Sequence, residues 1–180
     1  MTTFLSLFRG INVGGNHKVK MDELKAVHAA LGLTDVLTYI QSGNVVFKSD
    51  RTDTTHLQQQ IAASFATTFG FHAEVTIRTC DELNTIIAQN PFQNQPDKDP
   101  KWIAVLFLAT LPTSTAQETL HASYTGPEEI FCIGKEVYIY YPDGIGRSKL
   151  AHSFLEKKLQ TSGTARNLNT ILKLQELAQK

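Results

Sequence analysis

Glycine, asparagine and basic residues gather between an apolar run that ends at Phe8 and a helical pattern that begins near Met21. The glycines can adopt positive φ, and the asparagines tolerate it. A glycine loop between a strand and a helix can direct backbone N–H groups at an anion. We therefore predict a phosphate or carboxylate site in this first loop, formed by Arg9, Asn12, Gly14, Gly15, Lys18 and Lys20.

A tight turn with solvated lysines explains the same residues. The spacing matches neither the dinucleotide fingerprint nor the P-loop, and no acidic residue stands where a ribose partner would be needed. Basic side chains ahead of a helix oppose its dipole at a cost of roughly 0.3 kcal/mol or more, which a bound anion would relieve. Both interpretations stay open.

A second stretch of this kind covers residues 143–149, again between an apolar run and a helical pattern. Arg147 can bind a phosphate or carboxylate through two parallel hydrogen bonds. The order of glycine, serine and lysine resembles part of a P-loop, but this loop is too short to wrap a triphosphate. We add Arg147, Ser148 and Lys149 to the anion-binding candidates; pairing of Arg147 with Asp143 is the alternative.

No catalytic or metal-ligating motif accompanies these loops. The six histidines lack ligand spacing, and His28 is expected to pack on the apolar face of its helix. No nucleophile elbow occurs. The adjacent acids Glu128 and Glu129 should diverge and be solvated. Catalytic residues and cofactors therefore stay unknown, no metal is expected, and the sequence does not decide whether the protein is an enzyme.

The composition limits the partners. The 180 residues carry 17 basic and 17 acidic side chains, and this balance counts against a dedicated nucleic-acid binder. No apolar run approaches membrane-spanning length, so no membrane partner is expected. The only cysteines, Cys80 and Cys132, form no disulfide framework, and we expect both thiols free in a cytoplasmic protein. The oligomeric state is not indicated.

Hydrophobic periodicity predicts the elements that position the loops. The first part reads as strand, helix, two strands, helix and strand, over residues 3–8, 21–31, 36–40, 45–47, 57–69 and 73–77. A capping box at Thr79–Glu82 begins a further helix. The second part repeats this order, with a strand at 102–108, a helix from Ser114, a hairpin over 130–140, a helix capped by Ser148, a strand at 163–166 and a last helix capped by Asn167.

This order predicts an α+β fold of two fused ferredoxin-like halves with antiparallel sheets. We assign residues 1–89 to the first half, 90–101 to a linker and 102–180 to the second half. An internal duplication is favoured, with Gly43 matched to Gly134 and Arg78 to Arg166. Within each half we expect the first and third strands to run parallel.

Four motifs resemble the bacterial family called domain of unknown function 1697. They are Arg-Gly-Ile-Asn-Val-Gly-Gly in the first loop and the segments 39–47, 141–150 and 164–167. The resemblance implies two intertwined ferredoxin-like halves. It supplies no established activity and no catalytic residues.

The leading hypothesis is therefore a protein that binds a small phosphorylated or carboxylated ligand through glycine-basic loops. The alternatives are a protein-interaction or structural module, an enzyme acting on a phosphorylated substrate, and an RNA binder. The last would use Tyr138 and Tyr140 as a stacking platform, although an aromatic core explains these residues better.

Overall fold

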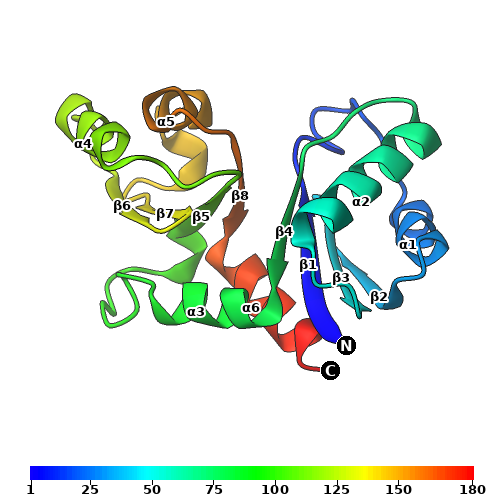
Figure 1. Cartoon of the computed structure of the whole chain (residues 1–180). Coiled ribbons are helices and arrows are strands. Elements are labelled where there is room, and N and C mark those ends of the chain that lie inside the picture. The colour runs from blue at the N-terminus through cyan, green and yellow to red at the C-terminus, as the bar shows by residue number, and fades with distance from the viewer. The chain divides into compact units, whose positions relative to one another are not determined.

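The computed structural model describes residues 1–180 and contains two four-stranded sheets (Figure 1). The first half of the chain forms β1 (Thr2–Phe8), α1 (Met21–Ala30), β2 (Thr34–Tyr39), β3 (Asn44–Ser49), α2 (Thr54–Phe69), β4 (Val75–Thr79) and α3 (Cys80–Ala88). The second forms β5 (Ile103–Leu108), α4 (Ser114–Ser123), β6 (Glu129–Ile133), β7 (Glu136–Tyr140), α5 (His152–Leu159), β8 (Gly163–Asn167) and α6 (Leu168–Ala178). The predicted order β-α-β-β-α-β thus occurs twice, each time followed by one more helix.

The strand orders are those of two ferredoxin-like halves. The first sheet runs β2-β3-β1-β4 and the second β6-β7-β5-β8. All neighbouring strands are antiparallel, including β1 with β3 and β5 with β7. The expectation of parallel first and third strands is therefore wrong. A hairpin inserts the third strand between the first and second, and those two are the parallel strands.

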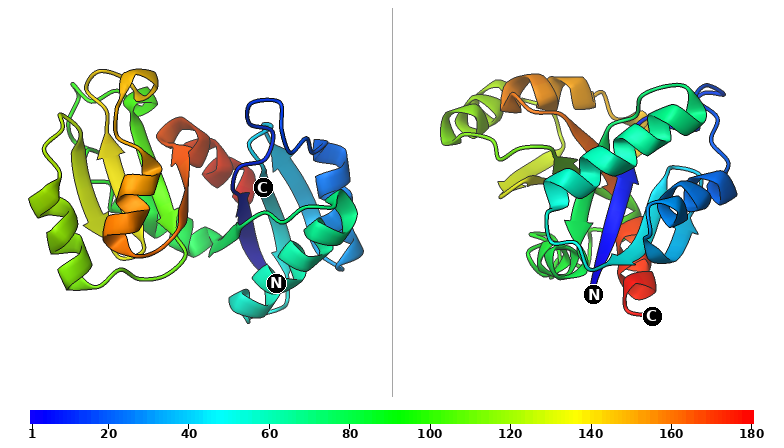
Figure 2. Two further views of the ribbon diagram at one scale, coloured as in Figure 1. Left: turned by 90° about the horizontal axis from the view of Figure 1, so that it is seen from above. Right: turned by 45° about the vertical axis from the view of Figure 1, so that its right-hand side comes forward.

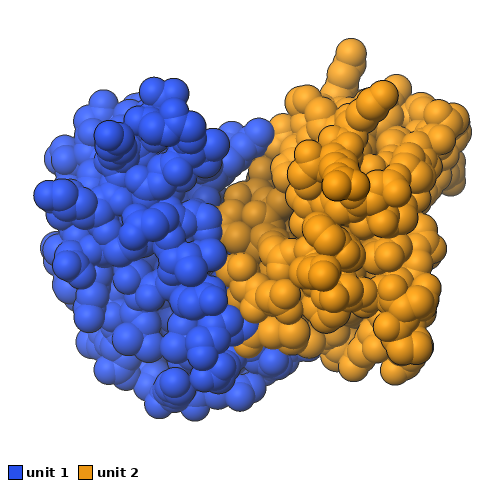
Figure 3. Space-filling model, turned by 180° about the vertical axis from the view of Figure 1, so that it is seen from behind, with its two compact units in different colours: residues 1–85, 173–180 blue, residues 86–172 orange.

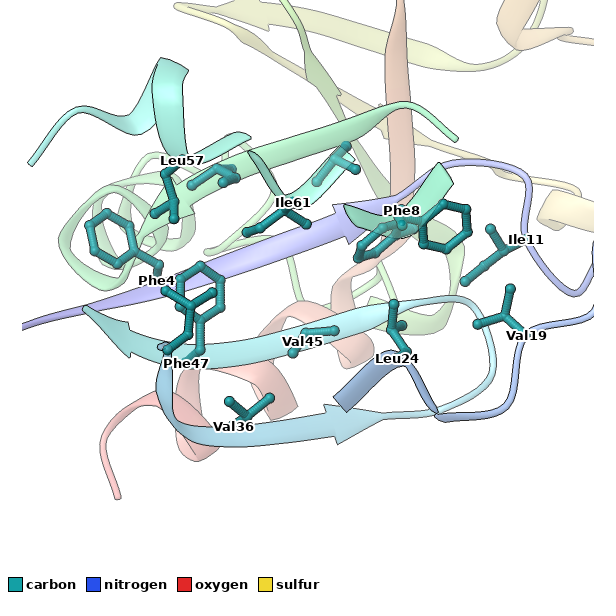
Figure 4. Packing of buried hydrophobic residues seen from close by; sticks show 14 residues of the cluster. Phe4, Phe8, Ile11, Val19, Leu24, Val36, Val45, Phe47, Leu57 and Ile61 are labelled. Carbon is teal, nitrogen blue, oxygen red and sulfur yellow. The ribbon is translucent and has the colours of Figure 1, made fainter. Parts of the chain in front are cut away.

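The core of the first sheet lies under α1 and α2. Side chains from alternate positions of β1, such as Phe4 and Phe8, point to the same side of the sheet as Phe47 of β3, where Leu57 and Ile61 of α2 pack (Figure 4). Full burial of each such side chain stabilises the fold by about 1.5–3 kcal/mol. A second apolar cluster joins β5 and β7 to α4 and α5.

The two hairpins have loops of different length, which changes their alignment. Asn44 pairs with Tyr39 across a loop at 40–43, whereas Glu136 pairs with Ile133 across Gly134 and Lys135. The ladders therefore align Asn44 with Glu136. Gly43 corresponds in register to Lys135 and not to Gly134, so this part of the predicted alignment is wrong by one residue.

The alignment of the last strands agrees with the register. Arg78 in β4 lies opposite Leu5, and Arg166 in β8 lies opposite Val105. Both arginines are buried. This correspondence supports the inference of an internal duplication.

Contacts divide the chain into two units (Figure 3). Unit 1 contains residues 1–85 and 173–180, and therefore both ends of the chain (Figure 2). Unit 2 contains residues 86–172. Both α3 and α6 thus begin in one unit and end in the other. The halves 1–89 and 102–180 with a linker at 90–101 stay a prediction, because a division by contacts does not test independent folding.

Helix caps follow the sequence at some positions and not at others. Thr79 and Glu82 form the predicted capping box, with the Thr79 amide donating to Glu82 at 2.7 Å and the Glu82 amide to Thr79 Oγ1 at 3.1 Å. The helix α4 begins at Ser114, as predicted, and its N-cap is Thr113, whose Oγ1 accepts from the Ala116 amide at 3.1 Å. Asn167 accepts from the Asn169 amide at the start of α6. None of the helices combines the length and apolarity that crossing a bilayer requires.

Candidate functional site

The first loop contains a tight hairpin turn. Gly14 and Gly15 have φ of 60° and 77°, and the Asn16 amide donates to the Val13 carbonyl at 3.1 Å. Positive φ at both central residues is typical of a type I′ turn. The two glycines are exposed, and their amides donate to no protein acceptor. The glycines therefore form the turn and also leave two N–H groups facing solvent.

Asn12 holds this loop together. Its Nδ2 donates to the carbonyls of Val19 at 2.9 Å and Gln41 at 2.8 Å, and its Oδ1 accepts from the Val19 amide at 2.8 Å. Asn12 adopts φ of 54°, a conformation that asparagine tolerates. With three internal hydrogen bonds, its amide has a structural role in this loop.

Most basic side chains of the first loop have acidic neighbours. Arg9 pairs with Glu74 at 3.2 Å, and Lys20 lies 4.0 Å from Glu23. Lys18 is exposed and makes no ion pair. A cavity of about 560 Å³ lies beside the loop and is lined by Lys18 and Lys20 but also by Asp22 and Glu23 of the first turn of α1. These two acids already complement the helix dipole, so the repulsion inferred from the sequence is offset within the chain.

The second loop has a different local structure from the one predicted. Gly144 has φ of 88° and ψ of 147°, a region accessible essentially only to glycine, and a Cβ there would lie 3.0 Å from the Trp102 ring. Residues Ile145–Arg147 form a short 3₁₀ helix. The prediction that Ser148 caps a helix is wrong: α5 begins at His152, and Ser148 Oγ instead accepts from the Leu150 amide at 3.0 Å.

Arg147, Ser148 and Lys149 line a cavity of about 560 Å³, which we call the unit 2 pocket. Its walls come from the end of α4, the turn before β6, the 147–151 segment and the start of α5. Arg147 and Lys149 are exposed and form no ion pair. The pocket combines this polar edge with an apolar wall formed by Tyr124, Pro127, Leu150, Ala151 and Phe154.

Glu128 is the residue of this pocket that sequence reasoning misses. Its side chain is 9% exposed, and its two carboxylate oxygens accept from Ser148 Oγ at 2.5 Å and from the Tyr124 hydroxyl. The expectation of solvation is therefore wrong for Glu128, while Glu129 pairs with Lys98. Gly126 and Pro127 predict a turn here, but no sequence signal indicates that the side chain after the turn folds inward.

The nine predicted anion-site residues fall into two groups. Arg9, Asn12, Gly14, Gly15, Lys18 and Lys20 belong to unit 1, and Arg147, Ser148 and Lys149 to unit 2. In unit 1, Asn12, Lys18 and Lys20 line the cavity beside the first loop, whereas Arg9, Gly14 and Gly15 do not. In unit 2, all three residues line the unit 2 pocket.

Other candidate side chains have structural roles. Tyr138 is buried and donates from its hydroxyl to the Ile86 carbonyl at 2.7 Å, so its ring is no platform for bases. Cys80 and Cys132 are free, as predicted, and burial raises the pKa of Cys132 to about 11. No three His, Cys, Asp or Glu side chains gather closely enough to hold a metal ion.

His28 packs as predicted. It is fully buried, its Nδ1 donates to the Leu24 carbonyl at 2.8 Å, and the Ser6 hydroxyl lies 2.9 Å from Nε2. Because a carbonyl only accepts, Nδ1 carries the proton and Nε2 accepts from Ser6. Burial lowers the pKa of His28 to about 4, so the ring is neutral at neutral pH.

The two sheets and their order define an α+β protein of two ferredoxin-like halves. The chain belongs to the DUF1697 family, described as a protein of unknown function, whose model matches residues 1–138. The chain is also similar to the solved structure of the conserved bacterial protein SP0830 from Streptococcus pneumoniae, with 26% identity and a TM-score of 0.79 over 100% of this chain and 99% of that one. Among curated proteins no match was found. The first loop lies inside the matched residues, whereas Arg147, Ser148 and Lys149 lie beyond them.

Proposed function

We propose that the protein binds a small phosphorylated or carboxylated ligand in the unit 2 pocket. The observation that carries this proposal is the position of Arg147 and Lys149, two cations without an ion-pair partner beside a cavity of about 560 Å³ with an apolar wall. Ligand pockets are typically concave and mostly apolar, with a few polar groups that fix the orientation of the ligand. Arg147 can donate two parallel N–H hydrogen bonds to the oxygens of a carboxylate or phosphate, and Lys149 adds a positive charge.

The first loop remains a second anion-binding proposal of the same kind. The free amides of Gly14 and Gly15 and the unpaired Lys18 favour it. Asp22 and Glu23 line the cavity beside Lys18 and Lys20 and repel an anion there. Two acids, Glu128 and Asp143, also line the unit 2 pocket, so acidic residues do not separate the two candidates. The wall of this cavity also has fewer apolar residues, only Val19 and Met21, than the wall of the unit 2 pocket. The larger number of apolar wall residues, and two cations that both lack an ion pair, make the unit 2 pocket the stronger candidate.

A cytoplasmic location belongs to the same proposal. Free thiols at Cys80 and Cys132 support it, because reducing compartments keep cysteines unpaired.

The test is a titration with inorganic phosphate, and in parallel with succinate, against melting temperature at constant ionic strength. A ligand that binds the folded state stabilises it by mass action, by about 2.7 kcal/mol at a hundredfold excess over Kd. We expect the wild type to respond, and the double variant Arg147→Ala/Lys149→Ala to lose most of the response. Lys25→Ala, which removes an exposed lysine of α1 outside both cavities, is the matched control.

The variant Lys18→Ala distinguishes the two loops. Loss of the response in Lys18→Ala with a normal response in the double variant would move the site to the first loop. No response of the wild type to either anion would overturn the proposal for both.

A further inference from the structure

The unit 2 pocket contains a buried negative charge. Glu128 lines the pocket, and its carboxylate accepts one hydrogen bond on each oxygen, from Ser148 and from Tyr124. A carboxylate has about four lone-pair sites, so each oxygen can accept another hydrogen bond. The acceptor capacity that remains is available to a donor within the pocket.

The chain supplies no direct ion-pair partner for this charge. Both donors are neutral hydroxyls, and Glu128 forms no ion pair with a lysine, arginine or histidine. Burial alone would raise the pKa of Glu128, but the hydrogen bonds from Ser148 and Tyr124 outweigh burial and lower it. Burial and this neighbouring charge raise the pKa of Tyr124 to about 12, so the tyrosine stays a donor. A buried carboxylate without a cation is costly, and a cationic partner would reduce that cost.

The local chain is shaped to keep this arrangement. A Cβ at residue 126 would overlap the Tyr124 hydroxyl, so only glycine at this position lets Tyr124 reach Glu128 undisturbed. The Tyr124 ring also lies 6.1 Å from the Phe154 ring, centroid to centroid. Both rings line the pocket, and the faces of aromatic rings attract cations.

We propose that the ligand of the unit 2 pocket is zwitterionic, with an ammonium or similar cationic N–H group that binds Glu128 and an acidic group that binds Arg147 and Lys149. This inference rests on the proposed function, because it assigns the second charge of the same ligand. An amine that also carries a phosphate or carboxylate has the required chemistry. The competing explanation is that Glu128 only ties Ser148 to Tyr124, and the experiment separates the two.

Calorimetric titration with matched probe pairs provides the test. O-phosphoethanolamine and ethyl phosphate differ in the ammonium group, as do 4-aminobutyrate and butyrate. In whichever pair binds, we expect the wild type to bind the aminated probe about tenfold more tightly than the amine-free probe. A tenfold difference is typical for one charge pair in a partly buried site. Glu128→Gln should reduce this preference below about threefold. Glu118→Gln, on the exposed face of α4, is the matched control.

The outcomes separate the two proposals. If no probe binds the wild type, the proposed function fails, and this inference with it. If the amine-free probes bind and the aminated ones bind no more tightly, the zwitterion inference alone fails. Equal preference in the wild type and in a folded Glu128→Gln variant also overturns it. The wild-type comparison decides even if that variant does not fold.

Discussion

The first loop in unit 1 and the second loop in unit 2 have the same sequence character, but their polar groups have different partners. In the first, Asn12 holds three backbone groups and Arg9 pairs with Glu74. In the second, Arg147 and Lys149 have no ion-pair partner and border a pocket with an apolar wall. Glycine and basic residues between a strand and a helix therefore do not by themselves indicate a binding site. Whether such a loop can bind a ligand depends on which of its side chains have no partner within the folded chain.

A buried ionisable group also supports an element in or next to each loop, and one group is neutral whereas the other is negatively charged. His28 anchors α1, the helix after the first loop, to Ser6 of β1 as a neutral ring. Glu128 anchors Ser148 of the second loop as a carboxylate. In the fold His28 is deprotonated and neutral, whereas Glu128 is deprotonated and charged. Acid protonates His28 at a higher pH than Glu128 and so weakens the two anchors in different pH ranges.

The largest expected effect is acid destabilisation through His28. Its pKa is lowered from 6.5 to about 4 in the folded state, so the unfolded chain binds more protons between these values. The stabilisation is fully present above pH 6.5 and falls by about 3 kcal/mol as the pH drops to about 4. Urea denaturation across this range measures it. The stabilisation from Glu128 is lost only below pH 4.5, because the pKa of this carboxyl lies below its usual value of 4.5.

The control for this prediction is a pair of substitutions. His28→Gln removes the titration and should flatten the dependence, whereas His56→Gln at an exposed position of α2 should leave it unchanged. Equal pH slopes in the wild type and in His28→Gln would show that His28 is not the anchor described.

A smaller effect distinguishes the first loop from the second. Asn12→Ala removes three hydrogen bonds and places alanine at φ of 54°, so we expect a loss of about 2 kcal/mol in the free energy of unfolding. Arg147→Ala should change it by less than about 0.5 kcal/mol, because exposed side chains without partners contribute little. Urea denaturation at pH 7 compares them, with Asn16→Ala as the matched asparagine control. A loss in Arg147→Ala equal to that in Asn12→Ala would contradict the comparison.

The sequence predicts the elements well and the site only in part. Phe4, Phe8 and Leu24 follow strand and helix periodicities, and such periodicity depends on local burial that the residue types themselves indicate. The register error at Gly43 arises because loop length is not visible from turn residues alone. Glu128 could not be found, because its burial results from Ser148 and Tyr124, which lie 20 and 4 residues away and are brought together only by the fold.

The smallest expected effect tests whether Gly14 serves the turn or an anion. Asn-Gly is the preferred pair for a type I′ turn, so Gly14→Asn should change the free energy of unfolding by less than about 0.5 kcal/mol. A Cβ at residue 14 meets no atom within 4 Å, so the fold itself has room for the side chain. The substitution keeps the backbone N–H but places a side chain where an anion would approach. If the first loop is only a turn, Gly14→Asn keeps both the stability and the phosphate response of the wild type. If it is the anion site, the stability is kept and the phosphate response falls, which would reverse the ranking of the two loops. Melting curves with and without phosphate, for the wild type and Gly14→Asn at equal ionic strength, decide between these two results.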